Sequence, residues 1–548
     1  MEQWIQNYAP VGDSILLSAL VAAIPLALLF YLLAVRRTPG HIAALTGTLT
    51  SLVLAIFVWG IPVEKGVSAT LMGAAFGLFP IVWIIITAVW IYNMTVESGE
   101  FEIIRNSLAG LTNDRRLQAI FIAFAFGSFI EGTAGFGTPV AITAAMLVGL
   151  GFNPLYAAGI CLIANTAPVA FGAIGVPITT AASVSGLDVN HISSIVGRQL
   201  PFLSIIVPFW VCCTMCGVKK TLEVLPAILV SGLCFAASQF VFSNFHGPYL
   251  PDIMSAIVTI IGLFILLRFW KPKNEWHFPD EKVSLEIKKY SSSQVLRAWS
   301  SYIFLAIMVF IWGLETFKGL GFVKAATFVF EWPWLHNLVA KAAPIVKETT
   351  PYGAKYTLNL LASGGTAILI AGLIASFCMP KYGLGKAIAC FARTIKQLRF
   401  PILTIATILG LAYIMNYSGM SSTLGLAFTE TGWWFPLFAP LIGWLGVFLT
   451  GSDTSSNALF CGLQRSTAEA LGLDPNLTVA ANSSGGVTGK MISPQSISVA
   501  TAATNLIGKE GNLFRFTLKH SIAMTVVVCI ITLLQAYWLK GMLPPYTP

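Results

Sequence analysis

The sequence predicts an all-α polytopic membrane protein of about 12–14 membrane segments. Its core is predicted to be two inverted repeats, each with a re-entrant hairpin and a broken transmembrane helix. Three observations predict this class. Of the 548 residues, 56% are hydrophobic and only 10% are charged, whereas soluble domains carry about 25% charged residues. Apolar runs of about 20 residues, the length that spans a bilayer, recur along the whole chain. Gly- and Pro-interrupted motifs also occur twice, about 320 residues apart.

The apolar runs set the order of the predicted membrane helices. The clearest predicted spans are 13–35, 41–60, 70–94, 200–217, 222–242, 252–269, 299–316, 362–379, 400–417 and 520–539. The longest polar stretches, 270–298 and 317–361, are predicted to be loops. The chain is therefore divided into N-terminal helices (1–66), a first repeat (67–217), connecting helices and loops (218–395) and a second repeat (396–548).

Basic residues indicate how the chain crosses the membrane. They gather at Arg36-Arg37, at Arg105 with Arg115-Arg116, at Lys219-Lys220, at 271–297, at 381–399 and at Lys509 with Arg515 and Lys519. The positive-inside rule places these segments, which we read as loops, in the cytoplasm. The opposing loops, predicted to lie outside together with both termini, are 63–67, 243–252, 317–361 and 418–432. The net charge of +9 is thus read as an orientation signal, which is much better supported than a nucleic-acid interpretation.

The duplicated motifs keep the same order in both copies. Residues 127–133 read GSFIEGT and residues 446–452 read GVFLTGS, and Gly151-Phe-Asn-Pro154 is matched by Gly472-Leu-Asp-Pro475. The predicted span 70–94 runs inward, whereas its counterpart 400–417 runs outward, so the two repeats are inverted. Inverted repeats place a shared binding site near the bilayer midplane, and such interrupted apolar segments are typical of transporter sites.

Each repeat is predicted to contain a hairpin and a broken helix. The first hairpin is 117–150, with the tip Glu131-Gly-Thr-Ala-Gly-Phe-Gly-Thr-Pro139. A Gly-rich tip that carries an acid cannot face lipid, so a re-entrant hairpin fits better than two complete spans. The other predicted elements are the broken helix 155–182, the hairpin 434–470 with its tip at Gly451 to Asn457, and the broken helix 477–503.

Helix breaks at membrane depth suit a solute anion. A half-helix that starts there points unpaired N–H groups and partial positive charge at its surroundings, and hydroxyl and amide side chains add neutral hydrogen bonds. The alternative, that Gly and Ser only permit close helix packing, does not explain a cluster repeated in inverted orientation. The predicted substrate-binding residues are Thr133, Gly135, Gly137, Asn165, Thr166, Ser452, Thr454, Ser455, Asn457, Asn482, Ser483 and Lys490.

Three ionisable residues lie in segments predicted to be at membrane depth, where a charge is costly and therefore points to function. Glu131 and Asp453 are predicted to carry the coupling proton, although Glu131 could instead cap a half-helix of its hairpin. Lys490 could attract a substrate carboxylate, or it could be the structural partner of Asp453 or of Glu131. The sequence leaves these two roles of Lys490 equally open.

Other classes of function find little support. The six His residues are scattered and no HExxH motif is present, so neither an enzyme nor a metal site is predicted. Cys213-x-x-Cys216 has metal-like spacing but no accompanying pair, and is read as buried apolar side chains. A channel would not need paired broken helices, which favour alternating access.

These motifs resemble the bacterial lactate permease family, the L-lactate and glycolate permeases. The resemblance extends essentially from end to end. It is carried by 131–143 (EGTAGFGTPVAIT), 165–172 (NTAPVAFG), 197–201 (GRQLP), 416–419 (NYSG), 448–460 (FLTGSDTSSNALF) and 485–495 (GGVTGKMISPQ).

The resemblance implies proton-coupled uptake of L-lactate, D-lactate and glycolate across the bacterial inner membrane, with no cofactor other than the coupling proton. The family also resembles the ion-transporter superfamily, so the likeness leaves a homodimer and an elevator-type motion open. No nucleic-acid partner is implied. A sodium-coupled carboxylate symporter is the alternative, since carbonyl-rich helix breaks can also hold Na⁺.

Overall fold

The computed structural model describes residues 3–545 apart from 37, 136, 280–287, 289, 347 and 381. Within these residues, ten helices or joined helices are long and apolar enough to cross a membrane, which confirms the predicted class of polytopic helical membrane protein. These candidate spans are Ile15–Leu33, Gly40–Phe57, Val63–Glu97, Val189–Leu222, Leu225–Phe245, Pro251–Phe269, Ser292–Trp312, Gly383–Ser418, Met420–Thr450 and Glu510–Tyr537.

The N-terminal part packs closely against a helix from the second half of the chain. Its helices are α1 (Ile15–Ala22), α2 (Ile24–Phe30), α3 (Gly40–Phe57), α4 (Val63–Phe76) and α5 (Trp83–Glu97). A Cβ added to Gly73 of α4 would lie 2.3 Å from the carbonyl oxygen of Leu409. Glycine therefore lets α4 and the helix that contains Leu409 approach as closely as backbones can.

The segment predicted as the first hairpin is two helical arms joined by a turn. The helices of this region are α6 (Glu100–Ala109), α7 (Arg115–Ala119), α8 (Gly127–Thr133), α9 (Thr138–Gly149), α10 (Pro154–Ala164) and α11 (Gly172–Ser185). Gly135 and Gly137, between α8 and α9, have φ of +60° and +81°, which glycine adopts readily. The two helical parts Pro154–Ala164 and Val169–Ser185 are bent by 64° at their break.

A buried arginine fastens the base of this hairpin. Arg116 has no exposed side-chain surface and pairs with Asp114 at 2.6 Å and with Glu223 at 2.9 Å. It also donates to the carbonyl oxygens of Lys220 and Asn274. One guanidinium therefore joins the start of the hairpin to the end of the helix that contains Lys220 and to the later segment that contains Asn274, as its five N–H donors allow.

Long helices and two small sheets form the middle of the chain. The helices are α12 (Val189–Leu222), α13 (Leu225–Phe245), α14 (Pro251–Phe269), α15 (Ser292–Gly313), α16 (Glu315–Lys318), α17 (Gly321–Ala325) and α18 (Gly364–Cys378). The strands are β1 (Trp4–Ile5), β2 (Thr327–Glu331), β3 (Val339–Lys341), β4 (Thr350–Pro351) and β5 (Lys355–Asn359).

The strands were not predicted. The stretch 317–361, predicted only as a loop, contains four of them: β2 and β5 form an antiparallel pair, and β3 pairs with β4 and with β1 near the N-terminus. Strands this short leave too little alternation for a periodic signal, and the parallel pair joins Trp4 to Val339, far apart in the sequence.

The second half also contains helices that are interrupted by short turns, at Gly451 and between Gly489 and Pro494. Its helices are α19 (Gly383–Ser418), α20 (Met420–Phe428), α21 (Phe435–Thr450), α22 (Asp453–Leu471), α23 (Pro475–Gly489), α24 (Pro494–Ala503) and α25 (Glu510–Tyr537). The basic stretch 381–399, which we predicted to be a loop, is helical from Gly383 onward, so α19 crosses the predicted boundary at 395/396. Lys386, Arg393, Lys396 and Arg399 lie on the exposed face of α19. A count of charges alone does not distinguish such a helix face from a loop.

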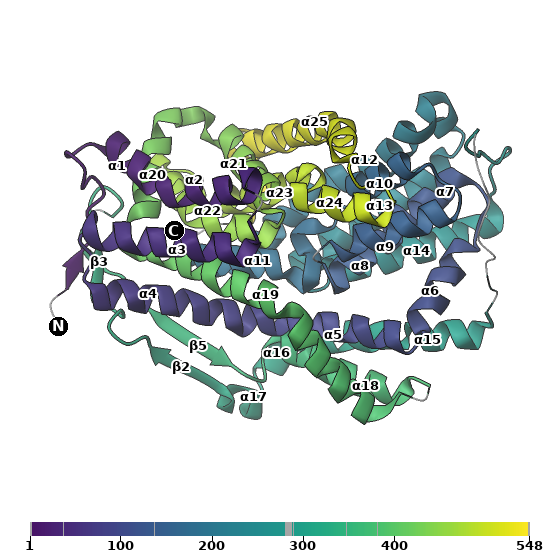
Figure 1. The fold of residues 1–548 in the computed structure, drawn as a ribbon, viewed down its shortest axis with the longest axis horizontal. Helices are drawn as coiled ribbons and strands as arrows, with labels where there is room; N and C mark the ends of the chain where they lie inside the picture. The colour runs from purple at the N-terminus through teal and green to yellow at the C-terminus, as the bar shows by residue number, and fades with distance from the viewer. Residues whose placement is uncertain are drawn as a thin grey trace.

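Figure 1 shows how these elements are arranged. The helices α3, α4 and α5 run along the long axis of the molecule, with the β2–β5 pair beside them. The helices α8 and α9 lie towards one end, whereas α21 and α22 lie towards the other end, and residues of both pairs line one cavity. The inverted relation of the two repeats stays a prediction.

Candidate functional site

The tips of the two hairpin segments and the two broken helices enclose one small cavity of about 50 Å³. This is room for several water molecules. Its lining comes from all four elements: Glu131, Gly135, Val169, Gly172, Ala173, Pro177, Gly451, Ser452, Asp453, Thr454, Lys490 and Gln495. Six of the residues predicted from the sequence therefore meet here, although they lie up to 359 positions apart.

An ion pair joins the two halves of the chain inside this cavity. Lys490 Nζ lies 2.9 Å from Glu131 Oε1, and the side chains are only 9% and 4% exposed. Asn165 donates from Nδ2 to the other carboxylate oxygen, Oε2, at 2.8 Å. Of the two partners left open for Lys490, the structure thus selects Glu131. The Glu131 carboxylate therefore accepts two charge-assisted hydrogen bonds, one from Lys490 and one from the Asn165 amide.

Glu131 fits only because glycine lies opposite it. A Cβ at Gly172, at the start of α11, would lie 2.6 Å from Glu131 Oε1. The backbone next to Gly172 is left-handed at Ala173, Ile174 and Gly175, so the helix is broken directly beside the ion pair. The break thereby makes the space that the carboxylate occupies.

Asp453 is the second buried acid of the cavity. It begins α22, and its Oδ2 accepts from Ser483 Oγ at 2.5 Å and from Asn457 Nδ2 at 3.4 Å. Its Oδ1 accepts no hydrogen bond within the described part of the chain. That oxygen packs against Gly486, where a Cβ would lie 2.3 Å away. Asp453 therefore has one satisfied and one unsatisfied oxygen.

Amides extend from Asp453 into the protein as a buried chain. Asn457 donates from Nδ2 to the carbonyl oxygen of Pro177 at 3.0 Å and accepts from Asn482 Nδ2 at 3.0 Å. Asn482 in turn accepts from Gln464 at 3.1 Å. Asn457, Asn482 and Ser483 thus hold the site together and do not line the cavity.

The starts of three helices lie at the cavity. Gly172 and Ala173 belong to the start of α11, Asp453 and Thr454 to the start of α22, and Gln495 to the start of α24. Helix N-termini carry unpaired N–H groups and partial positive charge, which favour an anion. The local field at this cavity therefore suits a carboxylate.

Some predicted binding residues have other surroundings. Thr133 donates to the carbonyl oxygen of Phe129 in its own helix, and Gly137 faces the side chain of Val499. Thr166 is buried, and its hydroxyl has no hydrogen-bond partner among the described residues. Ser455 lines a larger neighbouring cavity and not the small one.

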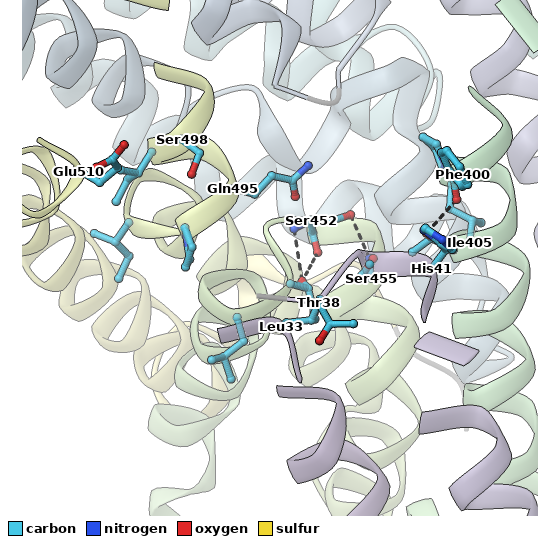
Figure 2. Close-up of a pocket in the computed structure, with 18 of the residues that line it drawn as sticks. Leu33, Thr38, His41, Phe400, Ile405, Ser452, Ser455, Gln495, Ser498 and Glu510 are labelled. Atoms are coloured by element: carbon cyan, nitrogen blue, oxygen red, sulfur yellow. Dashed lines mark hydrogen bonds between the residues drawn. The ribbon is translucent and has the colours of Figure 1, made fainter. Parts of the chain in front are cut away.

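The larger cavity, of about 670 Å³, adjoins the small one. Both are lined by Ser452 and Gln495. Figure 2 shows these two residues between Ser498 and Glu510 on one side and His41 with Phe400 on the other. The larger cavity is a vestibule, and Ser452 and Gln495 separate it from the ion pair. Its wall includes Thr38 and Phe400, which lie next to the basic segments at Arg36 and at 381–399 that the positive-inside rule predicts to be cytoplasmic.

Sequence reasoning missed Gln495, Gln464 and Asp252. Gln495 follows Pro494 in the repeated motif, so the helix break could have indicated it. Gln464 lies on a buried face of α22 and carries no local signal. Asp252 opened a predicted apolar span and looked like an ordinary helix end, yet it lies against Gly132 of the first hairpin segment.

Comparisons with known proteins agree with this architecture. Residues 18–539 match the L-lactate permease family. An L-lactate permease of Bacillus subtilis (strain 168) is 48% identical over 99% of this chain and 100% of its own length. The glycolate permease GlcA of Escherichia coli (strain K12) is 50% identical over the same shares of the two chains.

A solved structure shares the fold. Neisseria gonorrhoeae MtrF, from a class of antimetabolite efflux pumps, superposes with a TM-score of 0.51 at 13% identity, covering 92% of this chain and 97% of MtrF. At that identity the likeness concerns the fold alone. The family match and the two relatives extend over nearly the whole sequence, including both hairpin segments and both broken helices. The chain therefore belongs to the L-lactate permease family.

Proposed function

We propose that this protein takes up L-lactate and related 2-hydroxymonocarboxylates, including D-lactate and glycolate, together with protons across the bacterial inner membrane. The names of the relatives support the solute class. The observation that carries the coupling is the buried pair of Glu131 and Lys490, at 2.9 Å, beside three helix N-termini.

Charge balance links the solute to a proton at this pair. In the structure, Lys490 is neutralised by Glu131. A solute carboxylate that takes the place of Glu131 leaves the Glu131 carboxylate buried without its cation, which costs several kcal/mol. Protonation of Glu131 removes that cost. One carboxylate then enters with one proton, and the buried site stays neutral throughout.

The remaining groups give the solute its orientation. The carboxylate would lie against Lys490 and the N–H groups at the start of α22, where Ser452 and Thr454 line the cavity. The 2-hydroxyl would then bond to Thr454 or to the carboxamide of Gln495. A second carboxylate on the solute would need a second buried cation. Among the described residues that line the cavity, Lys490 is the only basic one, so dicarboxylates should be excluded.

The test is uptake of radiolabelled L-lactate into sodium-free proteoliposomes with an imposed inward proton gradient. Uphill uptake should collapse with a protonophore and should be inhibited by glycolate but not by succinate. Lys490→Met should abolish it, whereas Lys273→Met, which removes an exposed lysine, should not. Lactate uptake that is inhibited by succinate and not by glycolate would contradict the proposed solute class.

Sodium coupling is the second candidate. Buried oxygens without a hydrogen-bond donor among the described residues include Asp453 Oδ1, Asn165 Oδ1 and Thr166 Oγ1, and helix-break oxygens of this kind hold Na⁺ in other transporters. A sodium titration at constant proton gradient separates the two candidates. Uptake that begins only when sodium is added would replace the proton with Na⁺.

A further inference from the structure

Asp252, in the first turn of α14, is a buried acid that the scheme above does not use. Its side chain is 1% exposed. Neither carboxyl oxygen has a hydrogen-bond donor within the described residues. An ionised carboxylate buried without a partner costs several kcal/mol. The environment of Asp252 therefore fits the neutral carboxylic acid, which carries a proton.

Asp252 packs against Gly132, the residue that follows Glu131 in α8. A Cβ at Gly132 would lie 2.8 Å from the Cβ of Asp252 and 3.1 Å from the backbone nitrogen of Ile253. The start of α14 is thus pressed against α8 one residue beyond Glu131. Asp252 also interacts electrostatically with both Glu131 and Lys490, so its charge state and theirs are coupled.

Among the described residues on the helices packed against α14, no titratable group other than Glu131 lies close to Asp252. The helix α14 packs against α13, α8 and the helical segment 120–126. On these elements the titratable groups, besides Glu131, are Cys234 of α13 and His246 at its end. Cys234 lies against Gly262, about 15 Å along α14 from Asp252. The ring of His246 stacks on Phe310, with centroids 4.6 Å apart.

The segment before α14 closes this side of the site. A Cβ at Gly175, within the break of α11, would lie 2.4 Å from the carbonyl oxygen of Pro248, and one at Gly247 would lie 2.7 Å from Asn190 Oδ1. Residues 247–252 therefore seal both the helix break and the hairpin tip. The positive-inside rule places this segment outside, opposite to the vestibule of Figure 2.

We propose that Asp252 is the proton donor to Glu131. This inference rests on the proposed proton-coupled uptake. Asp252 holds a proton while Glu131 is paired with Lys490. When the solute carboxylate takes Lys490, the O–H bond of Asp252 breaks as that of Glu131 forms. Asp252 is then reloaded from external water once residues 247–252 lift, so each carboxylate still enters with one proton.

The test compares Asp252→Asn with Asp188→Asn in proteoliposomes. Asn replaces the neutral acid with a neutral amide of the same shape, but it cannot release a proton. Asp188 is an exposed acid at the start of α12 and serves as the matched control. For Asp252→Asn we expect at least tenfold slower uphill lactate uptake. Lactate/lactate exchange, in which the proton stays on the carrier, should keep at least half of the wild-type rate.

Three results would overturn the proposal. Uphill uptake by Asp252→Asn with the wild-type rate and pH profile would make Asp252 merely structural. Loss of exchange together with uptake would place it in solute binding and not in proton transfer. A variant that no longer folds would show that the ionised form is required, since the amide mimics only the neutral acid.

A second readout does not depend on transport. Infrared spectra of the purified protein at neutral pH should contain the carbonyl band of a protonated carboxylic acid that Asp252→Asn lacks and Asp188→Asn keeps. No loss of that band would overturn the proton-holding role even if lactate is transported. Wild-type protein that transports no 2-hydroxy acid would instead remove the proposed function, with the infrared result still deciding whether Asp252 holds a proton.

Discussion

Glu131→Gln and Lys490→Met should change lactate affinity in opposite directions. In the proposed function, the lactate carboxylate displaces Glu131 from Lys490, and we call this the displacement scheme. Loss of the competing Glu131 carboxylate should then strengthen lactate binding, and loss of the Lys490 cation should weaken it. A charge-assisted hydrogen bond is worth about 1.5–3 kcal/mol, and about 1.4 kcal/mol is a factor of ten in affinity. Lys490→Met should therefore weaken lactate binding about 10- to 150-fold, whereas Glu131→Gln should tighten it about tenfold.

Isothermal titration calorimetry of the detergent-solubilised protein measures these affinities and also counts protons. Repeating each titration in buffers of different ionisation enthalpy gives the number of protons taken up with lactate. We expect about one proton per lactate in the wild type, since Glu131 becomes protonated, and none in Glu131→Gln. The affinity of the wild type should correspondingly fall up to about tenfold per pH unit, and that of Glu131→Gln should not change with pH.

Matched controls and one opposite result make this test decisive. Glu348→Gln and Lys273→Met, which alter exposed residues, should leave the affinity and the proton count unchanged. If Glu131→Gln weakens lactate binding as strongly as Lys490→Met does, Glu131 holds the solute and does not compete with it. The displacement scheme, and the coupling derived from it, would then be wrong.

Two further predictions concern single positions. Gly486→Ala places a Cβ 2.3 Å from Asp453 Oδ1. It should lower lactate uptake at least tenfold and lower the free energy of unfolding by about 1–3 kcal/mol. The control Gly385→Ala, which has open space around it, should change neither lactate uptake nor stability. Burial raises the pKa of Glu100 to about 7 despite Arg297, so the folded protein should lose stability as pH rises from about 4.5 to 7, by at most about 3 kcal/mol. Glu100→Gln should abolish that loss and melt higher than the wild type at pH 8 in detergent, and an unchanged pH dependence of melting would contradict the assignment.

Several of the residues predicted from the duplicated motifs meet in the structure, and their role as a binding site stays a prediction. Glu131, Asp453 and Lys490 all line one cavity, although each was chosen only because a charge at membrane depth is costly. Which acid pairs with Lys490 could not be predicted, because that depends on how α8 and the segment after α23 pack. The structure decides it through a single 2.9 Å contact.

The surroundings of Asp252 could not be predicted from the sequence. An acid at the start of an apolar helix is stabilised by the helix dipole and is common there, so the residue alone predicts nothing. Its importance comes from the contact with Gly132 across 120 residues, and from the lack of a hydrogen-bond donor for either of its oxygens among the described residues. Both are properties of tertiary packing. The strands within 317–361 were missed because they are short, and β3 has one of its two partners, β1, near the N-terminus.

Several glycines of the motifs have a role in the structure other than forming a tight turn. Gly172 and Gly486 have ordinary backbone angles, yet each faces a carboxylate oxygen that a Cβ would displace: Glu131 Oε1 at 2.6 Å and Asp453 Oδ1 at 2.3 Å. Glycine is required at these positions because a buried acid from another element occupies the space of the missing side chain.

The same relation holds for two of the three residues that the sequence did not reveal. Gly132 faces Asp252, with 2.8 Å between the Cβ positions, and Gly451 faces Gln495, whose Oε1 would lie 2.3 Å from an added Cβ. A glycine in an interrupted helix therefore predicts a polar side chain opposite it as well as a turn. Because these side chains pack directly against the glycine backbone, a movement of a hairpin tip must also move the acid or amide packed on it. In the proposed scheme, solute binding at Lys490 and proton release at Asp252 are then mechanically linked through α8, which carries both Glu131 and Gly132.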